Sequence, residues 1–319
     1  MPSIITREEI NSVLPQIPVI SAMKEAFIQY SNGNAVVPPV GELIFENPPG
    51  DVHIKYGYIK NQDYYVIKIA SGFYENTKLG IPSGQGLMLL FKQKTGELEA
   101  ILLDDGHLTN IRTVSAGTLA IKYFASENVK RIGIIGTGTI AKLQIQQLQE
   151  NNLGSTFWLW GRNKAKAHQL KSALGAAYDI RIAESCQEVA QNTHVMVTTT
   201  PADSPLLHAE DIRKGSLIVA IGSDTEHKQE LDAGILQMAN LVVADSMPQS
   251  KSRGEIYQAV KTGAITLENV IEFGKALQDS KWQHSTDNHN IIVVDLTGVA
   301  VQDIMIASSV FTAFQKMEK

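Results

Sequence analysis

The hydrophobic and polar positions of this chain follow three successive patterns, and each predicts a different kind of element. Residues 6–31 predict a helix, because Thr6 is a typical N-cap residue and apolar side chains recur behind it at helical spacing. Residues 36–103 alternate apolar and polar positions between turn residues, which is typical of antiparallel strands. From residue 130 onward, short β-branched runs and amphipathic stretches indicate a parallel sheet covered by helices.

The alternating segment predicts five strands, the last two closed as a hairpin by residues 94–96. They are Glu42 to Phe45, His53 to Ile59, Tyr64 to Ala70, Gly86 to Phe91 and Glu97 to Leu103. Residues 71–86 form a loop rich in glycine and amides, suited either to enclosing a substrate or to an ordinary long connection. We therefore expect a mainly antiparallel α+β substrate-binding and dimerisation domain over residues 1–120, to which the final helix, residues 301–319, returns.

A strand, a glycine turn and a helix are predicted in succession within residues 130–148. The run Ile-Gly-Ile-Ile at 132–135 is typical of a strand that is buried on both faces. Gly136 permits a tight turn, Gly138 lets the backbone approach a pyrophosphate, and Ala141 allows close packing of helix on strand. This spacing, with a strand before it and a helix after it, predicts a dinucleotide site.

Further cofactor contacts are expected along the same edge of the sheet. The helix that begins near Thr139 would direct its unpaired N–H groups at the phosphates. The apolar run at residues 194–202 should border the nicotinamide, because ligands of open parallel sheets bind at strand carboxyl ends. Further along the chain, residues 267–277 are predicted to form a helix. The predicted contacts in this part of the chain are Gly136, Thr137, Gly138, Thr139, Ile140, Thr199 and Thr200.

The second parallel strand, residues 156–160, ends without the Asp or Glu that NAD enzymes usually place there for the ribose hydroxyls. Arg162 and Lys166 follow instead, and cations tolerate a 2′-phosphate. We therefore expect NADPH, with NADH as the other candidate, contacted by Arg162, Asn163 and Lys166; alternatively, Arg162 only stacks on adenine. Residues 121–300 as a whole predict a Rossmann-type doubly wound parallel sheet, so the fold class is α/β.

Two lysines lie in strands that are otherwise apolar. Lys68 follows Tyr-Tyr-Val-Ile in a strand expected to be half or wholly buried, and lysine is seldom buried without an anionic partner. A ligand carboxylate would be such a partner; alternatively, the side chain extends its amine to solvent along its stem. Lys55, in the preceding strand, is a weaker candidate for the same role of binding a ligand carboxylate.

An arginine near a helix start is a further candidate for binding an anion. Thr109 can cap a helix whose first turn presents Arg112, and the small residues 115–117 allow another element to approach closely. Its planar guanidinium suits a forked grip on a carboxylate. The alternative is an ion pair within the protein, with Asp104 or Asp105 as partner.

The composition narrows the functional class. The 319 residues include 28 basic and 33 acidic side chains, a net charge of −5 without a basic tail, which argues against nucleic-acid binding. The single Cys186 excludes a disulfide framework within the chain, which fits a protein of the reducing cytoplasm. No Cys or His pair has metal-ligand spacing, so we expect no metal site. We expect neither a secretory signal nor a membrane span, because Asp295, Gln302 and Asp303 interrupt the apolar C-terminal stretch.

Taken in order and spacing, these motifs resemble the ornithine cyclodeaminase/μ-crystallin family over almost the whole chain. They are Lys68 in its Val-Ile-Lys strand, the Leu-Thr-x-x-Arg-Thr helix start, the Ile-Gly-x-Gly-x-x-Ala turn, and a Gly-x-Asp followed by Lys-Gln-Glu-Leu. The family includes ornithine cyclodeaminases, alanine dehydrogenases, ketimine reductases and hormone-binding μ-crystallin, so the resemblance alone does not choose a reaction. It implies a homodimer.

The resemblance adds residues to the predicted site. Asp224 follows a predicted strand and should therefore point into the cleft, and the family's matching Asp is catalytic. The alternative is that Asp224 caps a helix over residues 228–231. The resemblance also implies cofactor contacts from Thr297, Gly298 and Val299.

The predicted substrate carries an anionic end with a cationic nitrogen next to it, as an α-imino acid does. Arg112, Lys55 and Lys68 would bind the carboxylate, Lys68 and Asp224 are the predicted catalytic residues, and the nicotinamide would supply hydride. We therefore predict a reductase of small cyclic ketimines, which converts Δ1-pyrroline-2-carboxylate to L-proline or the piperideine analogue to L-pipecolate.

Two departures from the family pattern favour this hypothesis over a cyclodeaminase. Family cyclodeaminases carry an extra arginine where this chain has Val40-Gly-Glu-Leu, and Cys-Pro-Gly or Ala-Pro-Gly where it has Thr225-Glu-His. Ornithine cyclodeaminase is therefore the second hypothesis and alanine dehydrogenase the third. A non-enzymatic protein that binds NADPH and a small ligand, as μ-crystallin does, is the fourth.

Overall fold

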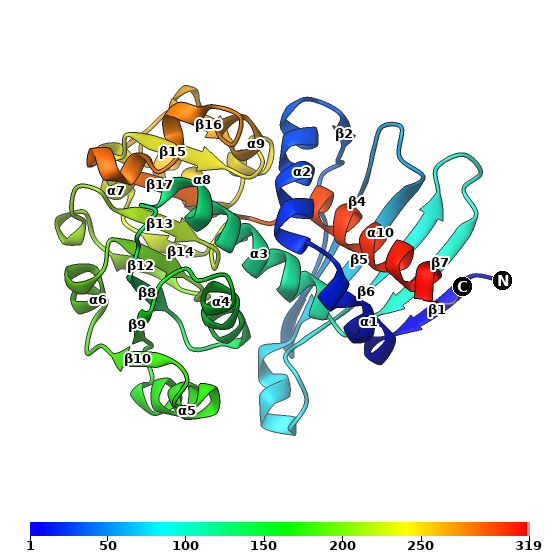
Figure 1. Cartoon of the computed structure of the whole chain (residues 1–319), viewed down its shortest axis with the longest axis horizontal. Helices are drawn as coiled ribbons and strands as arrows, with labels where there is room; N and C mark the ends of the chain where they lie inside the picture. Colours follow the sequence, from blue (N-terminus) through cyan, green and yellow to red (C-terminus); the bar gives the residue numbers. More distant parts are fainter. Residues whose placement is uncertain (318–319) are drawn as a thin grey trace. The chain divides into compact units, whose positions relative to one another are not determined.

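The computed structural model describes residues 1–317 and divides the chain into two compact units (Figure 1). Unit 1 comprises Met1–Arg112 and the C-terminal segment from Val299, and unit 2 comprises Thr113–Gly298. We expected the division after residue 120, whereas it falls at Arg112, inside a continuous helix. Both predicted parts of the α/β fold are present, one mainly antiparallel and one parallel. No helix of the described residues is long and apolar enough to cross a membrane.

Unit 1 is built on a seven-stranded sheet in the order β1-β7-β6-β5-β4-β2, with β3 paired to β4. All five predicted strands are present, and β1 and β2 were not predicted. Every pairing is antiparallel except that of β1 with β7. The strands are β1 (Ser3–Thr6), β2 (Ala35–Val36), β3 (Gly41–Glu46), β4 (Pro49–Ile59), β5 (Tyr64–Gly72), β6 (Gly84–Lys92) and β7 (Leu98–Leu103).

The single helix predicted over residues 6–31 is wrong, because two prolines interrupt it. The segment forms α1 (Arg7–Val13), a 3-10 turn η1 (Leu14–Gln16) and α2 (Val19–Ser31). Pro15 and Pro18 lack the N–H that a continuous helix would need, so each stands at the start of a new element. The predicted cap is confirmed: Thr6 Oγ1 accepts from Glu9 N at 3.4 Å, and Glu9 Oε2 accepts from Thr6 N at 2.7 Å.

The helix α10 (Ala300–Met317) covers one face of this sheet (Figure 1). The strand register places Lys55, Lys68, Met88 and Leu102 in one row across β4, β5, β6 and β7 on the covered face. Met88 and Leu102 are fully buried, so the two lysines end a row that is otherwise core. The loop expected over residues 71–86 is shorter than predicted, because β5 and β6 extend into it and a 3-10 helix η2 (Tyr74–Leu79) lies between them.

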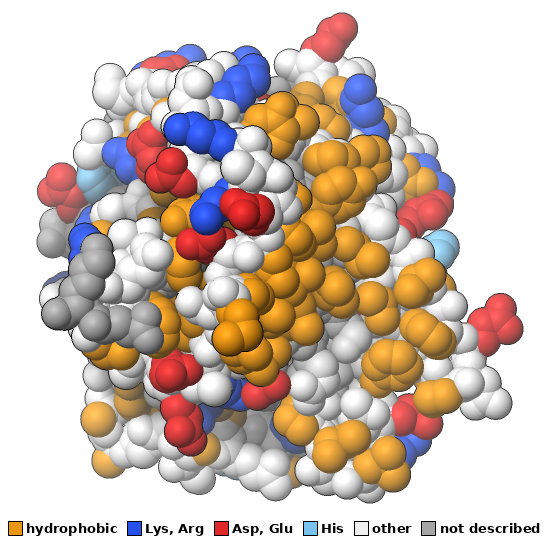
Figure 2. All heavy atoms as spheres, turned by 90° about the vertical axis from the view of Figure 1, so that its right-hand side faces the viewer, with side chains coloured by type: hydrophobic (Ala, Val, Ile, Leu, Met, Phe, Trp, Pro, Cys, Tyr) orange, Lys and Arg blue, Asp and Glu red, His pale blue; other side chains and the backbone are white. Residues whose placement is uncertain are grey.

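The opposite face of the sheet is hydrophobic and open. Six large hydrophobic side chains of this face have exposures from 37 to 60%. Figure 2 shows hydrophobic side chains gathered on the side of the molecule where these strands lie. We define this outer face by Ile4, Leu43, Phe45, Tyr56, Tyr58 and Leu103.

Unit 2 contains an eight-stranded, fully parallel sheet in the order β10-β9-β8-β11-β13-β17-β15-β16. The chain starts at β8 and builds outward in both directions, so the order reverses between β8 and β11. That reversal is the switch point where doubly wound sheets bind ligands. The strands are β8 (Arg131–Ile135), β9 (Thr156–Trp160), β10 (Asp179–Ile182), β11 (Val195–Thr198), β13 (Leu217–Ala220), β15 (Leu241–Ala244), β16 (Val270–Glu272) and β17 (Ile292–Asp295).

Helices pack around this sheet, together with a small two-stranded pair formed by β12 (Asp203–Leu207) and β14 (Gln229–Leu231). The helix predicted over residues 267–277 is wrong: its β-branched centre forms the edge strand β16, and only α9 (Phe273–Ala276) is α-helical. The other helices are α3 (His107–Phe124), α4 (Thr139–Glu150), α5 (Lys164–Leu174), α6 (Cys186–Asn192), α7 (Ala233–Met238) and α8 (Gly254–Lys261).

Candidate active site

Lys68 and Lys55 lie directly opposite each other on β5 and β4. Both are buried, with 3% and 6% of their surface exposed. The alternative in which Lys68 extends its amine to solvent is therefore wrong. Burial lowers the pKa of Lys68 to about 8, although the neighbouring Asp303 carboxylate acts in the opposite direction. An amine with this pKa exchanges its proton near neutral pH.

Lys68 and Arg112 share one anionic partner, a residue that the sequence did not single out for the site. Asp303, in the first turn of α10, lies with Oδ2 at 3.3 Å from Lys68 Nζ and Oδ1 at 3.2 Å from Arg112 Nε. It is 1% exposed. Its neighbour Gln302 accepts a 3.2 Å hydrogen bond from Arg112 Nη1. In the sequence, Gln302 and Asp303 stood out only as polar residues that interrupt an apolar stretch.

The prediction for the start of α3 needs correction. The helix begins at His107, and Asp104 caps it by accepting from Leu108 N at 2.7 Å, so Thr109 is not the cap. Arg112 consequently lies in the second turn. Neither acid suggested as its partner pairs with it, because Asp105 lies 3.9 Å from Arg7 instead.

Among the buried charged side chains of unit 1, cations outnumber acids. Its buried ionisable side chains among the described residues are three cationic ones and two acids: Lys55, Lys68, Arg112, Asp104 and Asp303. Burial also raises the pKa of Asp104 to about 6, which weakens its contribution as an anion. A buried excess of one charge is costly, and an anionic ligand would compensate it.

In unit 2, the glycine turn between β8 and α4 has the predicted form. Gly136 has a φ of +127°, and its N–H donates to Trp160 O at 2.8 Å. A Cβ at this residue would lie 2.2 Å from Thr199 Oγ1, so only glycine fits. Gly138 is the N-cap of α4, and a Cβ there would meet nothing within 4 Å. This open space at a helix N-terminus fits a pyrophosphate.

The residues expected at the adenine end lie at the carboxyl end of β9 and the start of α5. Arg162 and Lys166 are exposed, and no acid of this stretch replaces the missing carboxylate. The Asn163 side chain is the N-cap of α5, accepting from Ala165 N at 3.0 Å and Lys166 N at 3.3 Å. These capping bonds engage the Asn163 side-chain oxygen, and the cofactor contacts predicted for Arg162, Asn163 and Lys166 stay predictions.

Glu230, which sequence reasoning missed, organises the loops after β11 and β13. It is fully buried and accepts hydrogen bonds from Thr198 Oγ1 at 2.7 Å, from Thr200 N at 2.6 Å and from Gly222 N at 2.9 Å. Thr200 Oγ1 also donates to it at 2.7 Å. Burial raises its pKa to about 7 in spite of these donors. Thr200, a predicted cofactor contact, is thus held by an acid beneath it.

A row of buried acids continues from Glu230 along the strand ends. Glu255 accepts from Glu230 N at 2.7 Å and Leu231 N at 3.1 Å, and burial raises its pKa to about 8. Burial, with Glu255 next in importance, raises the pKa of Asp295 well above its ordinary value. These acids hold protons that exposed carboxyl groups would release.

The fourth acid of the row, Asp245, positions the segment for which the family resemblance implied nicotinamide contacts. Its carboxylate accepts from Thr297 Oγ1 at 2.9 Å and from Gly298 N at 2.6 Å. Val299, the next residue, begins the return to unit 1, where its N–H donates to Gln302 Oε1 at 3.1 Å. The three predicted contacts are therefore ordered, and their role toward a cofactor stays a prediction.

Asp224 lies in the loop after β13, as predicted. The helix that it might have capped does not exist, because residues 229–231 form the strand β14. Its side chain, 38% exposed, instead forms an ion pair with Lys228 Nζ at 2.6 Å. A partly exposed carboxylate at a strand carboxyl end can exchange protons with a ligand, and its catalytic role stays a prediction.

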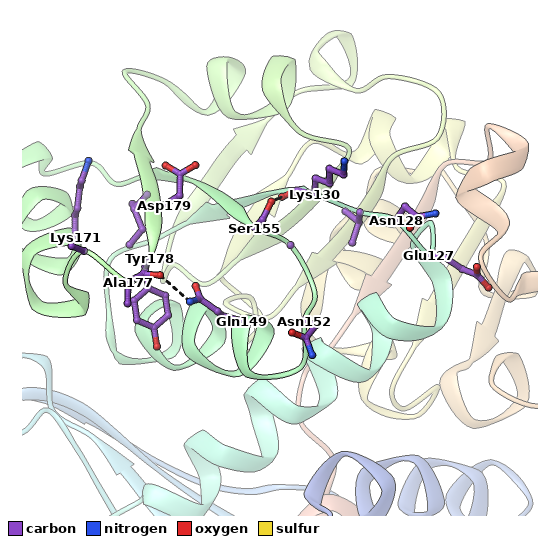
Figure 3. A pocket seen from close by; sticks show the side chains of 14 residues that line it. Glu127, Asn128, Lys130, Gln149, Asn152, Ser155, Lys171, Ala177, Tyr178 and Asp179 are labelled. Carbon is purple, nitrogen blue, oxygen red and sulfur yellow. Dashed lines mark hydrogen bonds between the residues drawn. The ribbon is translucent and has the colours of Figure 1, made fainter.

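A hollow with a volume of about 780 Å³ lies elsewhere. It is lined by residues at or just before the starts of β8, β9 and β10, including Lys130, Ser155 and Asp179 (Figure 3). Gln149 Nε2 donates to Ala177 O across it. These residues stand at the amino ends of the strands, opposite the glycine turn. Size alone therefore does not identify the candidate site.

The family model described as the ornithine cyclodeaminase/mu-crystallin family matches residues 2–318. An uncharacterized cyclodeaminase of Sinorhizobium fredii is 34% identical (99% of this chain, 96% of the relative), and the alanine dehydrogenase of Archaeoglobus fulgidus is 35% identical (97% and 94%). A Δ1-pyrroline-2-carboxylate reductase of Bacillus cereus is 26% identical (97% and 95%).

Two solved structures show the same fold along the whole chain. An archaeal alanine dehydrogenase dimer with bound NAD has a TM-score of 0.89 and 30% identity, and covers 100% of this chain and 97% of its own. The Δ1-pyrroline-2-carboxylate reductase of Thermococcus litoralis, in complex with NADH and L-proline, has a TM-score of 0.91 at 24% identity (99% and 98%). The predicted family and fold are thereby confirmed.

Aspartate at Gly138 should weaken NADPH binding without unfolding the protein. Asp is a favoured N-cap residue and a Cβ here meets nothing within 4 Å, so α4 should be retained, while the charge of Asp would repel a pyrophosphate. We expect the dissociation constant for NADPH, measured by fluorescence titration, to rise at least about tenfold. Ser185→Asp, which places the same charge at the N-cap of α6, is the matched control. Wild-type affinity in Gly138→Asp would show that the turn binds no phosphate.

Glutamine at Glu255 should flatten the pH dependence of stability. Because burial raises the pKa of Glu255 from 4.5 to about 8, its proton stabilises the folded state below about pH 4.5, and this contribution is lost as the pH rises to about 8. The amide of Glu255→Gln cannot ionise. Urea unfolding at about pH 5.5 and about pH 8.5 should therefore show a smaller loss of stability in Glu255→Gln than in wild type. The exposed Glu268→Gln should follow wild type; an unchanged slope in Glu255→Gln contradicts the assignment.

Proposed function

Because this chain belongs to the ornithine cyclodeaminase/μ-crystallin family, we propose that it is a nicotinamide-dependent reductase of small cyclic ketimines such as Δ1-pyrroline-2-carboxylate. The observation that carries this proposal is the buried positive charge of unit 1, where Lys68 and Arg112 share one carboxylate. A small substrate with its own carboxylate would complete that charge balance. The pyrroline-2-carboxylate reductase of B. cereus, 26% identical, supports the choice of substrate class.

In this proposal unit 1 holds the substrate and unit 2 holds the cofactor. Arg112 and Lys68 neutralise the substrate carboxylate and fix its orientation, which replaces a bimolecular encounter by a positioned one. Asp224 pairs with the protonated imine nitrogen and exchanges a proton with the amine that forms. The hydride would come from the nicotinamide of the cofactor when it is bound. Thr297 and Gly298, ordered by Asp245, would hold its ring.

The proposed cofactor is NADPH. Arg162 and Lys166 are exposed where a ribose phosphate would lie, and the carboxylate that selects NAD is missing from the end of β9. NADH is the other candidate, because the archaeal alanine dehydrogenase that shares this fold binds NAD.

A second candidate function is alanine dehydrogenase. The A. fulgidus enzyme of that name is 35% identical, which exceeds the identity to the B. cereus reductase. Both reactions pass through an imine beside a carboxylate, and the same cations could bind either substrate. The difference lies in ammonia: an open-chain imine must be made from a keto acid and ammonia, whereas a cyclic ketimine already contains its nitrogen. The cyclodeaminase of S. fredii, 34% identical, makes ammonia release a third outcome worth measuring.

We also propose a homodimer that buries the outer face of the unit 1 sheet. Six large hydrophobic side chains of this face are exposed, and monomeric proteins rarely expose so broad an apolar patch (Figure 2). The alanine dehydrogenase of the same fold was crystallised as a dimer. A two-fold interface would place the same face of each copy against the other.

The reaction can be tested by following NADPH absorbance. We expect oxidation of NADPH with Δ1-pyrroline-2-carboxylate and no ammonia requirement. Oxidation that needs pyruvate and ammonia would favour alanine dehydrogenase, and ammonia release from ornithine with NAD would favour a cyclodeaminase. Cofactor binding without turnover of any of these compounds would contradict an enzymatic function.

The same assay includes a matched pair of arginine variants. Arg112→Ala should raise the KM for the ketimine by about 30-fold, as expected for the loss of about 2 kcal/mol of charged hydrogen bonding, with a smaller change in kcat. Arg7→Ala removes a largely exposed arginine of the same unit and should leave KM unchanged. Equal effects of the two substitutions would remove Arg112 from the substrate site.

Glutamate at Tyr56 should break the proposed dimer. The substitution would bury an unpaired charge twice in a symmetric interface, once from each copy. We expect light scattering to show a dimer for wild type and a dissociation constant at least about 100-fold higher for Tyr56→Glu. Met238→Glu, at an exposed methionine of unit 2, should remain dimeric. A monomeric wild type would contradict this assignment of the outer face.

A further inference from the structure

Asp303 lies close to two buried cations, but it accepts a hydrogen bond from neither of them. Its oxygens lie 3.3 Å from Lys68 Nζ and 3.2 Å from Arg112 Nε, but neither contact has the geometry of a hydrogen bond. Both oxygens lack any hydrogen-bond donor among the described residues. The carboxylate therefore holds the two cations by charge, and the Lys68 ammonium stays available for another acceptor.

The start of α10 fixes this arrangement. Gln302 Oε1 accepts from Val299 N at 3.1 Å and from Arg112 Nη1 at 3.2 Å, and Gln302 Nε2 donates to Arg112 O at 3.3 Å. One amide thus ties the first turn of α10 to both the guanidinium and the backbone of Arg112. Since Asp303 is the next residue on the same turn, its position relative to Arg112 is set by these bonds.

We propose that Asp303 is a positioning residue of the substrate site, which sets the Lys68 ammonium and the Arg112 guanidinium side by side so that together they bind a small carboxylate. This inference rests on the proposed function. Arg112 uses Nε toward Asp303 and Nη1 toward Gln302, and within the described part of the chain Nη2 donates no hydrogen bond. The ammonium and Nη2 would supply the donors, while Asp303 does not touch the substrate.

Electrostatics explains why a carboxylate is needed at this position. Without Asp303 the two cations would repel each other in a site that water screens poorly. Asp303 is the first of the groups that oppose the effect of burial on the pKa of Lys68, and Arg112 acts in the same direction as burial. Removing the negative charge should therefore lower this pKa below about 8. Lys68 would then lose its proton at neutral pH and bind anions poorly.

The test is Asp303→Asn, an isosteric change that removes only the charge. The probe is pyrrole-2-carboxylate, a flat carboxylate analogue, titrated by calorimetry into the NADP⁺-saturated protein between about pH 6 and about pH 9. We expect the dissociation constant to rise at least about tenfold at pH 7.5 and its increase with pH to begin at a lower pH than in wild type. The dissociation constant for NADPH should not change.

Asp104→Asn is the matched control, because it neutralises another buried carboxylate of unit 1 whose oxygen accepts from Leu108 N. If Asp303 only stabilised unit 1, both variants would melt earlier and bind the probe alike. We expect instead that the affinity changes by less than about twofold in Asp104→Asn. Equal affinity and equal pH dependence in Asp303→Asn and wild type would overturn the proposal.

Asp303→Asn could fail to fold, or wild type could fail to bind the probe, and each outcome has its own meaning. If Asp303→Asn does not fold, Asp303→Glu keeps the charge but moves it by one methylene: weaker probe binding at an unchanged pH dependence supports the positioning role, and wild-type affinity overturns it. If wild type itself binds neither pyrrole-2-carboxylate nor L-proline, the proposed function fails together with this inference. Probe binding in wild type with no effect of either substitution at Asp303 removes only the inference.

Discussion

One buried carboxylate allows unit 1 to keep two cations inside its core. Lysine and arginine side chains are rarely buried, because the lost hydration of each charge costs several kcal/mol. Lys68 and Arg112 both meet Asp303, which lies on a helix that covers the same sheet face. The same two cations are the residues that we propose to bind the substrate carboxylate. The packing of α10 on the sheet and the chemistry of the site therefore depend on the same contact.

Unit 2 uses the opposite arrangement. Its strand ends carry acids, of which Glu230 and Glu255 have pKa values raised by burial to about 7 and about 8. These acids accept hydrogen bonds from the backbone of the loops that border the predicted cofactor site. The loops are consequently held from below, and their upper edges stay free for a ligand. Buried cations in unit 1 and buried acids in unit 2 fit the proposed reaction between an anionic imine and a pyridine nucleotide.

Local patterns predicted much of this structure, and long-range pairings did not follow from them. The turn at Gly136 and Gly138 and the five antiparallel strands depend on neighbouring residues, and all are present. Asp303 was visible only as a polar residue in an apolar helix, because 190 positions separate Arg112 from the adjoining Gln302. Glu230 was hidden for the same reason, since its partners come from two other loops. Pro15 and Pro18 were visible, and the helix over residues 6–31 should have been divided there.

The order of the chain has a consequence for biosynthesis. Unit 2 is one uninterrupted stretch inserted into unit 1, and α10 is synthesised after the whole of unit 2. Until then, the sheet of unit 1 lacks its helical cover, and Lys68 lacks the Asp303 carboxylate that offsets its desolvation. The nascent sheet must therefore remain hydrated at its lysines while the inserted unit folds. The N-terminal segment of unit 1 therefore completes its core only when the segment that follows unit 2 has been made.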